Sequence, residues 1–103
     1  MQPKRMKPTV RRDQIFDVAV KMAEKKRYDQ MTRDQIAESA GVSVGLVSAY
    51  FGTMPNLRRD IMRYAIKTGN LTILAQGLGV GDQHAKKAPD ELKQAALTKM
   101  GAL

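Results

Sequence analysis

The chain has 103 residues and a formal net charge of +8, because 18 lysines and arginines stand against 10 aspartates and glutamates. It contains no cysteine, which excludes disulfides and thiolate metal sites and is compatible with a reducing compartment. It also lacks an apolar run of about 18 residues and the apolar core of a secretory signal, so we expect one small cytoplasmic domain without a membrane span.

The positive charge is concentrated at the N-terminus. Residues 1–12 carry five basic side chains and no acidic one, and the prolines among them favour an extended conformation. Such a segment suits a polyanion, because neutralised phosphates release counterions, although a solvated tail that only aids solubility explains it about as well. We predict a basic arm over residues 1–10. Its predicted DNA contacts are Lys4, Arg5 and Lys7.

The first predicted helix covers residues 12–27. Ile15, Ala19 and Met22 recur with helical spacing and form an apolar stripe, while most charged side chains lie opposite. The segment closes with "KKRYD", which contains no glycine. We therefore expect an amphipathic helix that ends without a glycine cap.

The stretch "TRDQIAESAGVSVGLVSAYF" predicts two short helices. Thr32 is the N-cap of a helix over 33–40, because its hydroxyl can accept from the free backbone N–H groups of the first turn. Gly41 suits the left-handed position after that helix. Ser43 is in turn the expected N-cap of a helix over 44–51.

The spacing within this stretch matches a helix-turn-helix pair. Such a pair needs a small residue where the helices cross, a glycine with positive φ in the turn, and apolar residues after the turn and further along the second helix. Ala37, Gly41, Val42, Val47 and Tyr50 meet these demands. An ordinary helix hairpin would have to place all of them by chance, so we favour the DNA-binding interpretation.

The rest of the chain completes an all-α domain. "GTMPN" is a break, after which Pro55 stands in the first turn of a fourth helix that ends near residue 68. "LTILA" either extends that helix or forms a short strand, and "QGLGVGDQHAKKA" is typical of a flexible loop. A final helix is expected over 89–100, with Pro89 and acidic residues at its start. The predicted organisation is a basic arm, a helix-turn-helix domain and a C-terminal extension, at residues 1–10, 11–68 and 69–103.

Residues 11–66 resemble, without a gap, the N-terminal DNA-binding domain of the TetR repressor family. "IFDVAVKMAEKKRYDQMT" is similar to its first helix and following turn, "IAESAGVSVGLVSAYF" to its turn and following aromatic pair, and "NLRRDIM" to the start of its fourth helix. The resemblance implies a transcriptional regulator that binds double-stranded DNA through the helix over 43–51 in the major groove, and most simply a repressor.

The sequence departs from this family in four positions and in length. The family usually has glycine at the position of Arg27 and lysine at that of Val44. It usually has tyrosine at the position of Ser48 and lysine at that of Met54. The last two positions commonly contact DNA phosphates in the family, so we expect weaker binding to the DNA backbone at Ser48 and Met54. Only about 35 residues follow the fourth helix. We therefore expect the family's ligand-binding domain, and with it a small-molecule inducer, to be absent.

The second helix of the pair has one face available for DNA. Packing of its apolar residues leaves a face with no arginine, asparagine or glutamine that could form a bidentate bond with a base. We therefore expect modest discrimination, supplemented by Arg33 and by the arm in a minor groove. The predicted DNA-binding residues are Lys4, Arg5, Lys7, Arg11, Thr32, Arg33, Ser43, Val44, Gly45, Ser48, Ala49 and Tyr50.

A small DNA-binding domain gains affinity when two copies bind two half-sites, which predicts a homodimer on a palindromic operator. The candidate pairing surfaces are the Leu57/Ile61/Tyr64 side of the fourth helix, the run 71–75, and the stripe Leu92, Ala95, Ala96, Met100 and Leu103. A regulator without a sensing domain fits the control circuit of a phage or plasmid, acting at the nucleoid of a bacterial host.

Other functions have less support. His84 is the only histidine and no carboxylates stand at metal-ligand spacing, so we expect no metal, cofactor or enzymatic activity. Too few residues follow "LTILAQGLGVG" for a dinucleotide-binding unit. The main alternative is a protein-interaction subunit that modulates another DNA-bound protein. Membrane binding through the arm ranks low, because no bulky amphipathic helix adjoins it.

Overall fold

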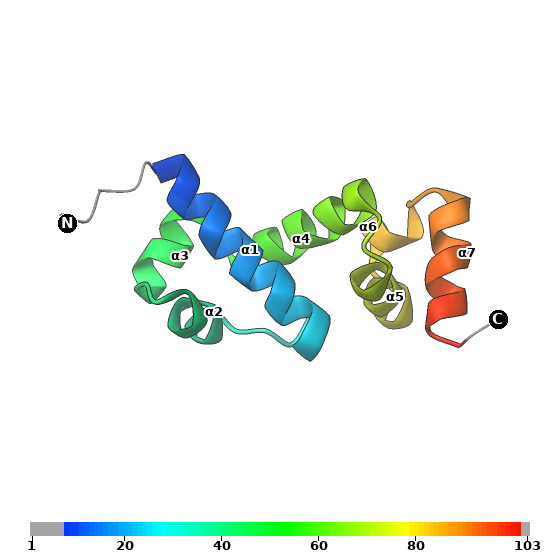
Figure 1. The fold of residues 1–103 in the computed structure, drawn as a ribbon, viewed down its shortest axis with the longest axis horizontal. Coiled ribbons are helices and arrows are strands. Elements are labelled where there is room, and N and C mark those ends of the chain that lie inside the picture. Colours follow the sequence, from blue (N-terminus) through cyan, green and yellow to red (C-terminus); the bar gives the residue numbers. More distant parts are fainter. Residues whose placement is uncertain (1–7, 102–103) are drawn as a thin grey trace, which may run out of the picture.

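The structure, a computed structural model, describes residues 8–101, and these form seven helices and no strand. The helices are α1 (Pro8–Lys26), α2 (Arg33–Ala40), α3 (Val44–Phe51), α4 (Met54–Thr68), α5 (Leu71–Val80), α6 (Gln83–Lys86) and α7 (Asp90–Lys99). The molecule is elongated, 52 × 23 × 20 Å. α1, α2 and α3 lie at one end and α5, α6 and α7 at the other, with α4 running between them (Figure 1). The all-α prediction is confirmed.

One apolar core runs through both ends of the molecule. Its fully buried side chains include Ile15 of α1, Ile36 of α2, Ile61 and Met62 of α4, and Leu74 of α5. α2 packs against α1 and α3, whereas α5 packs against α4, α6 and α7. Because a single core continues into α5, the C-terminal helices belong to the same folded unit as the helix-turn-helix pair.

α1 is longer than the sequence predicts. It begins at Pro8 and ends at Lys26, rather than covering 12–27. Proline is favoured at the start of a helix, because the N–H that it lacks would have no partner there. Residues 8–10 are therefore helical, and the prediction that they form part of an extended arm is wrong.

α1 ends at a residue with an unusual backbone conformation. Arg27 has a φ of 81° and is the one non-glycine residue with positive φ among residues 8–101. A left-handed backbone costs a residue with a side chain roughly 1–2 kcal/mol. The side chain pairs with Asp29, with Nε and Nη2 at 3.2 and 3.0 Å from the two carboxylate oxygens. The predicted helix end without glycine is confirmed, and Arg27 adopts the conformation that glycines adopt after α2, α4 and α5.

The C-terminal third differs most from the prediction. Gly69 ends α4 with a φ of 72°, and the Asn70 side chain accepts from the Ile73 N–H to cap a new helix. "LTILA" therefore belongs to α5 and neither extends α4 nor forms a strand. The predicted flexible loop is largely helical, within α5 and α6, and of its glycines only Gly81 has a positive φ. The predicted final helix is confirmed as α7, which follows Pro89.

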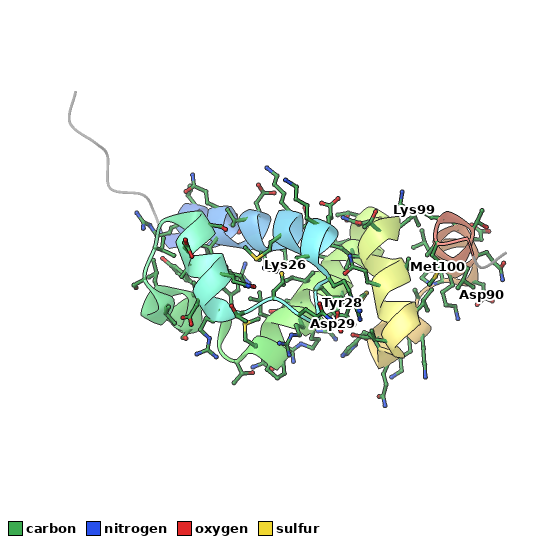
Figure 2. All side chains as sticks on the ribbon, turned by 90° about the horizontal axis from the view of Figure 1, so that it is seen from below. Lys26, Tyr28, Asp29, Asp90, Lys99 and Met100 are labelled. Carbon is green, nitrogen blue, oxygen red and sulfur yellow. The ribbon has the colours of Figure 1, made fainter. Side chains whose placement is uncertain are left out.

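Hydrogen bonds join the two ends of the molecule at Tyr28, which is buried between them (Figure 2). Its hydroxyl donates to Asp82 Oδ2 at 2.6 Å, and its backbone N–H donates to Gln76 Oε1 at 2.8 Å. The Gln76 amide donates in turn to the Ala23 carbonyl at 2.8 Å. Burial and the bond to Asp82 raise the pKa of the Tyr28 phenol, which therefore stays protonated. The turn before α2 is thus held by α5 and by the cap of α6.

Candidate nucleic-acid interface

The segment that joins α2 and α3 has helix-turn-helix geometry. α2 begins with a capping box, in which Thr32 Oγ1 accepts from the Gln35 N–H at 3.2 Å and the Thr32 N–H donates to Gln35 Oε1 at 3.1 Å. Gly41 ends α2 in the left-handed conformation with a φ of 69°. The Val42 N–H then donates to the Ala37 carbonyl at 3.0 Å. The predicted bounds and caps of α2 are confirmed.

α3 has a packed inner face and a free outer face. Val47 and Phe51 are 2% and 5% exposed and lie in the core, with Leu46 and Tyr50 half-buried beside them. Ser43 caps α3 by accepting from the Leu46 N–H at 3.1 Å. The outer face of α3 is formed by Ser43, Val44, Gly45 and Ala49, which are exposed, and by Ser48, which is half-buried. This is the division between packed and free residues that the spacing predicts.

Gly45 lies on the outer face without an internal packing reason. A Cβ at this position would have Ser43 Oγ, at 3.9 Å, as its nearest neighbour, so a side chain would fit. Glycine inside a helix costs about 1 kcal/mol relative to alanine. The fold gains nothing from glycine here, whereas a missing side chain allows the backbone to approach a ligand closely.

The outer face offers small chemical groups. The hydroxyls of Ser43 and Ser48 can donate or accept hydrogen bonds. Val44, which is 39% exposed, and Ala49 present methyl groups. Base edges in the major groove combine donors, acceptors and the thymine methyl. The outer face can therefore match base edges by hydroxyl and methyl contacts, without a bidentate bond.

Four other predicted contacts lie on α1, at the start of α2 and on α3. Thr32 is exposed at the start of α2, where free N–H groups and the helix dipole favour an anion. Arg33 is half-buried, and its Nε is enclosed without a hydrogen-bond partner among residues 8–101. Arg11 is half-buried beside a cleft of about 400 Å³ between α1 and the turn. Tyr50 is half-buried, and its ring packs edge-on against that of Phe51.

The N-terminal basic residues are only partly within the described segment. The predicted contacts that lie outside the described residues are Lys4, Arg5 and Lys7. Arg12 is described, and the sequence prediction counted it only as a charge. Its guanidinium carbon lies 4.9 Å from the ring centroid of Phe51 and 5.9 Å from that of Phe16. The available signal was an arginine four residues before an aromatic residue on one helix.

Six of the side chains predicted to pair two copies are buried within one chain. The buried members are Leu57, Ile61, Ile73, Leu74, Ala75 and Ala96. Tyr64 and Met100 remain exposed, and Leu103 lies outside the described residues. α7 packs on α5, so its apolar stripe does not need a second copy to cover it. The assignment of these stripes as free pairing surfaces is wrong for their buried residues.

The histidine and acidic side chains of the described residues are dispersed or serve as helix caps. Among residues 8–101, no three histidine, aspartate or glutamate side chains gather as a metal site. No helix there is long and apolar enough to cross a bilayer. His84 is half-buried in α6, and its backbone N–H donates to Asp82 Oδ1 at 2.7 Å. Asp90 and Glu91 stand in the first turn of α7, where acidic side chains complement the helix dipole.

A comparison with protein-family models identifies the same segment. The family described as "Bacterial regulatory proteins, tetR family" matches residues 15–61, which run from α1 through the helix-turn-helix pair into α4. Nothing matches the chain among curated proteins or among solved structures. The matched range contains all of α2, the turn and α3. Residues 15–61 therefore match the helix-turn-helix DNA-binding domain of the tetR family, and the match implies a DNA-binding transcriptional regulator.

Proposed function

We propose that α3 lies in the major groove of an operator and that the protein represses transcription from there. The observation that carries the proposal is the free outer face of α3, on which Gly45 has no internal packing role. The major groove of B-DNA is about 12 Å wide and admits one helix. Glycine at this position lets the backbone of α3 approach the base edges more closely than any other residue would.

Base recognition rests on small groups of the outer face. The hydroxyls of Ser43 and Ser48 bond to base edges, and the methyl groups of Val44 and Ala49 pack against thymine methyls. A bidentate pair would contribute about 1–3 kcal/mol of discrimination, and this face has none. Each half-site therefore discriminates modestly between sequences.

Phosphate contacts supply much of the affinity. Thr32 and Arg33 at the start of α2, together with Arg11 and Tyr50, contact the DNA backbone. The basic residues before α1 extend into a neighbouring minor groove, as N-terminal arms do in other DNA-binding folds. A net charge of +8 supports this division of roles. We expect a steep loss of affinity with salt, because each neutralised phosphate releases counterions.

Modest discrimination by one α3 favours a homodimer on a palindromic operator. Two symmetric copies place their recognition helices one DNA turn apart, about 34–36 Å. The base contacts of the two half-sites then add, and the sequence preference of the dimer exceeds that of one copy. Such a dimer on a promoter excludes polymerase, which makes repression the simplest outcome.

Selection of bound sequences from a pool of random duplexes, with the full chain, tests this function. We expect a palindromic consensus with half-sites about one turn apart, and reduced transcription from a promoter that contains it. A49E, which places a carboxylate on the outer face, should abolish binding to the consensus. Q94E adds the same charge at an exposed position of α7 and should retain it.

Three outcomes would contradict the proposal. Binding without any preferred sequence would indicate a general DNA-coating protein. The absence of binding to every duplex would favour the alternative, a subunit that acts on another DNA-bound protein. Loss of binding in both A49E and Q94E would show that added negative charge, and not the outer face, is responsible.

A further inference from the structure

Arg12 bridges the first helix and the end of the recognition helix. Its guanidinium carbon lies 4.9 Å from the Phe51 ring centroid and 5.9 Å from the Phe16 ring centroid, and the two rings are 5.9 Å apart. Phe16 follows Arg12 by one turn of α1, and Phe51 is the last residue of α3. The first turns of α1 pass beside α3 at the same end of the molecule (Figure 1).

These aromatic rings and Arg12 join the end of α3 to α1. α3 also packs against α2 and α4. Phe51 is buried, and Gly52 turns the chain away immediately after it with a φ of 72°. A cation over an aromatic face is attracted to the ring. Arg12 therefore contacts the last residue of α3, next to the point where the chain turns away.

A guanidinium that packs against a ring can keep its N–H donors for another partner. The interaction with a ring uses the face of the planar group, whereas its N–H donors point outward in the plane. The Arg12 side chain is 43% exposed, and its carboxylate partner Asp13 lies 3.7 Å away with a side chain 78% exposed. An ion pair that exposed contributes little. The Arg12 donors can therefore bind a phosphate while the guanidinium stays over Phe51.

We propose that Arg12 is a positioning residue of the DNA interface, which binds a backbone phosphate with its edge and holds Phe51 with its face. A phosphate that fixes the guanidinium also fixes the Phe51 ring beneath it. Contact with the DNA backbone and the orientation of α3 are therefore coupled through the Arg12 side chain. Lysine would neutralise the phosphate but has no plane with which to cover the ring. This inference rests on the proposed placement of α3 in the major groove.

Three variants test it: R12Q, R12K and the control R11Q, which removes a neighbouring charge that has no aromatic partner. Each is compared with the wild type on the selected duplex and on a mixed-sequence duplex over a range of salt concentrations. We expect R12Q to lower affinity for the selected duplex about tenfold and to reduce the slope of log K against log salt by about 0.9, the value of one phosphate. R12K should keep the slope but lose about threefold of the preference for the selected duplex. R11Q should weaken both duplexes by the same factor.

The outcomes separate this inference from simpler ones. If R12K keeps the full preference for the selected duplex, Arg12 contributes only its charge. If R12Q keeps both the salt slope and the preference but melts at a lower temperature, Arg12 serves only the stability of the fold. Either result overturns the proposal. Circular dichroism establishes whether each variant is folded. If R12Q does not fold, the sequence preference of R12K alone tests the proposal. A wild type that prefers no duplex would reject the proposed function, whereas a wild type with a preference that both Arg12 variants share would reject this inference alone.

Discussion

α3 and α5 are similar in composition and differ in their surroundings. Each is short and apolar, contains glycine within the helix and carries no charged residue. A Cβ at Gly45 in α3 would meet only Ser43 Oγ at 3.9 Å. A Cβ at Gly77 in α5 would overlap Met62 Cε and approach Ala85 Cβ to 2.8 Å. A glycine inside a helix can thus serve either a close internal contact or a surface kept free for a ligand, and its neighbours decide which.

The environment of α5 explains why the C-terminal helices are part of the fold. Gly77 allows α5 to approach Met62 of α4 and Ala85 of α6. Gln76, the preceding residue, accepts from the Tyr28 N–H and donates to the Ala23 carbonyl. α5 therefore has neighbours on several sides, whereas the neighbours of α3 cover only its inner face.

Valine at each glycine should give the largest difference between the two helices. In G77V the added methyl groups would be forced into Met62 and Ala85, and overpacking of this kind costs about 3 kcal/mol. G45V should change the free energy of unfolding by less than about 0.5 kcal/mol, because there is room and the helix propensities of glycine and valine are close. Urea unfolding of both variants measures the difference. Equal losses would contradict the distinction between the two glycines.

The Tyr28 hydroxyl tests how closely the two ends of the molecule are joined. Y28F removes the donor to Asp82 Oδ2, and a hydrogen bond to a charged group contributes about 1.5–3 kcal/mol. Asp82 is half-buried, so we expect a loss near the low end of that range. Y64F is the matched control on an exposed ring and should change stability little. A Y28F protein as stable as Y64F would show that the bond does not hold the ends together.

The same hydroxyl gives stability a pH dependence of defined sign. Burial, and then the bond to Asp82, raise the pKa of Tyr28 in the folded protein above its ordinary value of about 10. At higher pH the unfolded chain loses this proton while the folded chain keeps it, so the free energy of unfolding falls as pH rises. We expect a steeper fall in the wild type than in Y28F between about pH 10 and 11. Parallel curves for the two proteins would rule this out.

Alanine at Gly45 should have the smallest effect on the fold. G45A should raise the free energy of unfolding by about 0.5–1 kcal/mol, because alanine is the better helix former and the space is open. Its affinity for the selected duplex should fall, because the methyl group would separate the backbone from the base edges. Urea unfolding and a binding titration measure the two effects. A more stable variant with unchanged affinity would argue against close approach at Gly45.

α2 and α3 can be predicted from the sequence because local side chains set their bounds. Thr32 and Ser43 bond to N–H groups three residues further along, and Gly41 supplies the left-handed residue between the helices. The free outer face then follows from helical periodicity alone. None of these features depends on a residue that is distant in the chain.

α5, α6 and the stack on Phe51 depend on distant residues and could not be predicted in this way. Gly77 suggested a loop, yet its role is set by Met62 and Ala85 on other helices. Arg12 looked like one charge among several, because its partner Phe51 is brought to it only by the fold. A local signal for α5 did exist in Gly69 followed by Asn70, a helix end and the cap of the next helix.

Site-specific crosslinking tests most directly whether the outer face of α3 contacts DNA. The chain has no cysteine, so A49C creates a single thiol on that face, and Q94C creates one at an exposed position of α7. A photoactivated crosslinker is attached to each thiol, and each labelled protein is bound to the selected duplex. We expect crosslinks from position 49 to bases within a half-site and none from position 94. Binding of both proteins without base crosslinks from position 49, or with equal crosslinks from both positions, would contradict the assignment of α3 as the recognition helix.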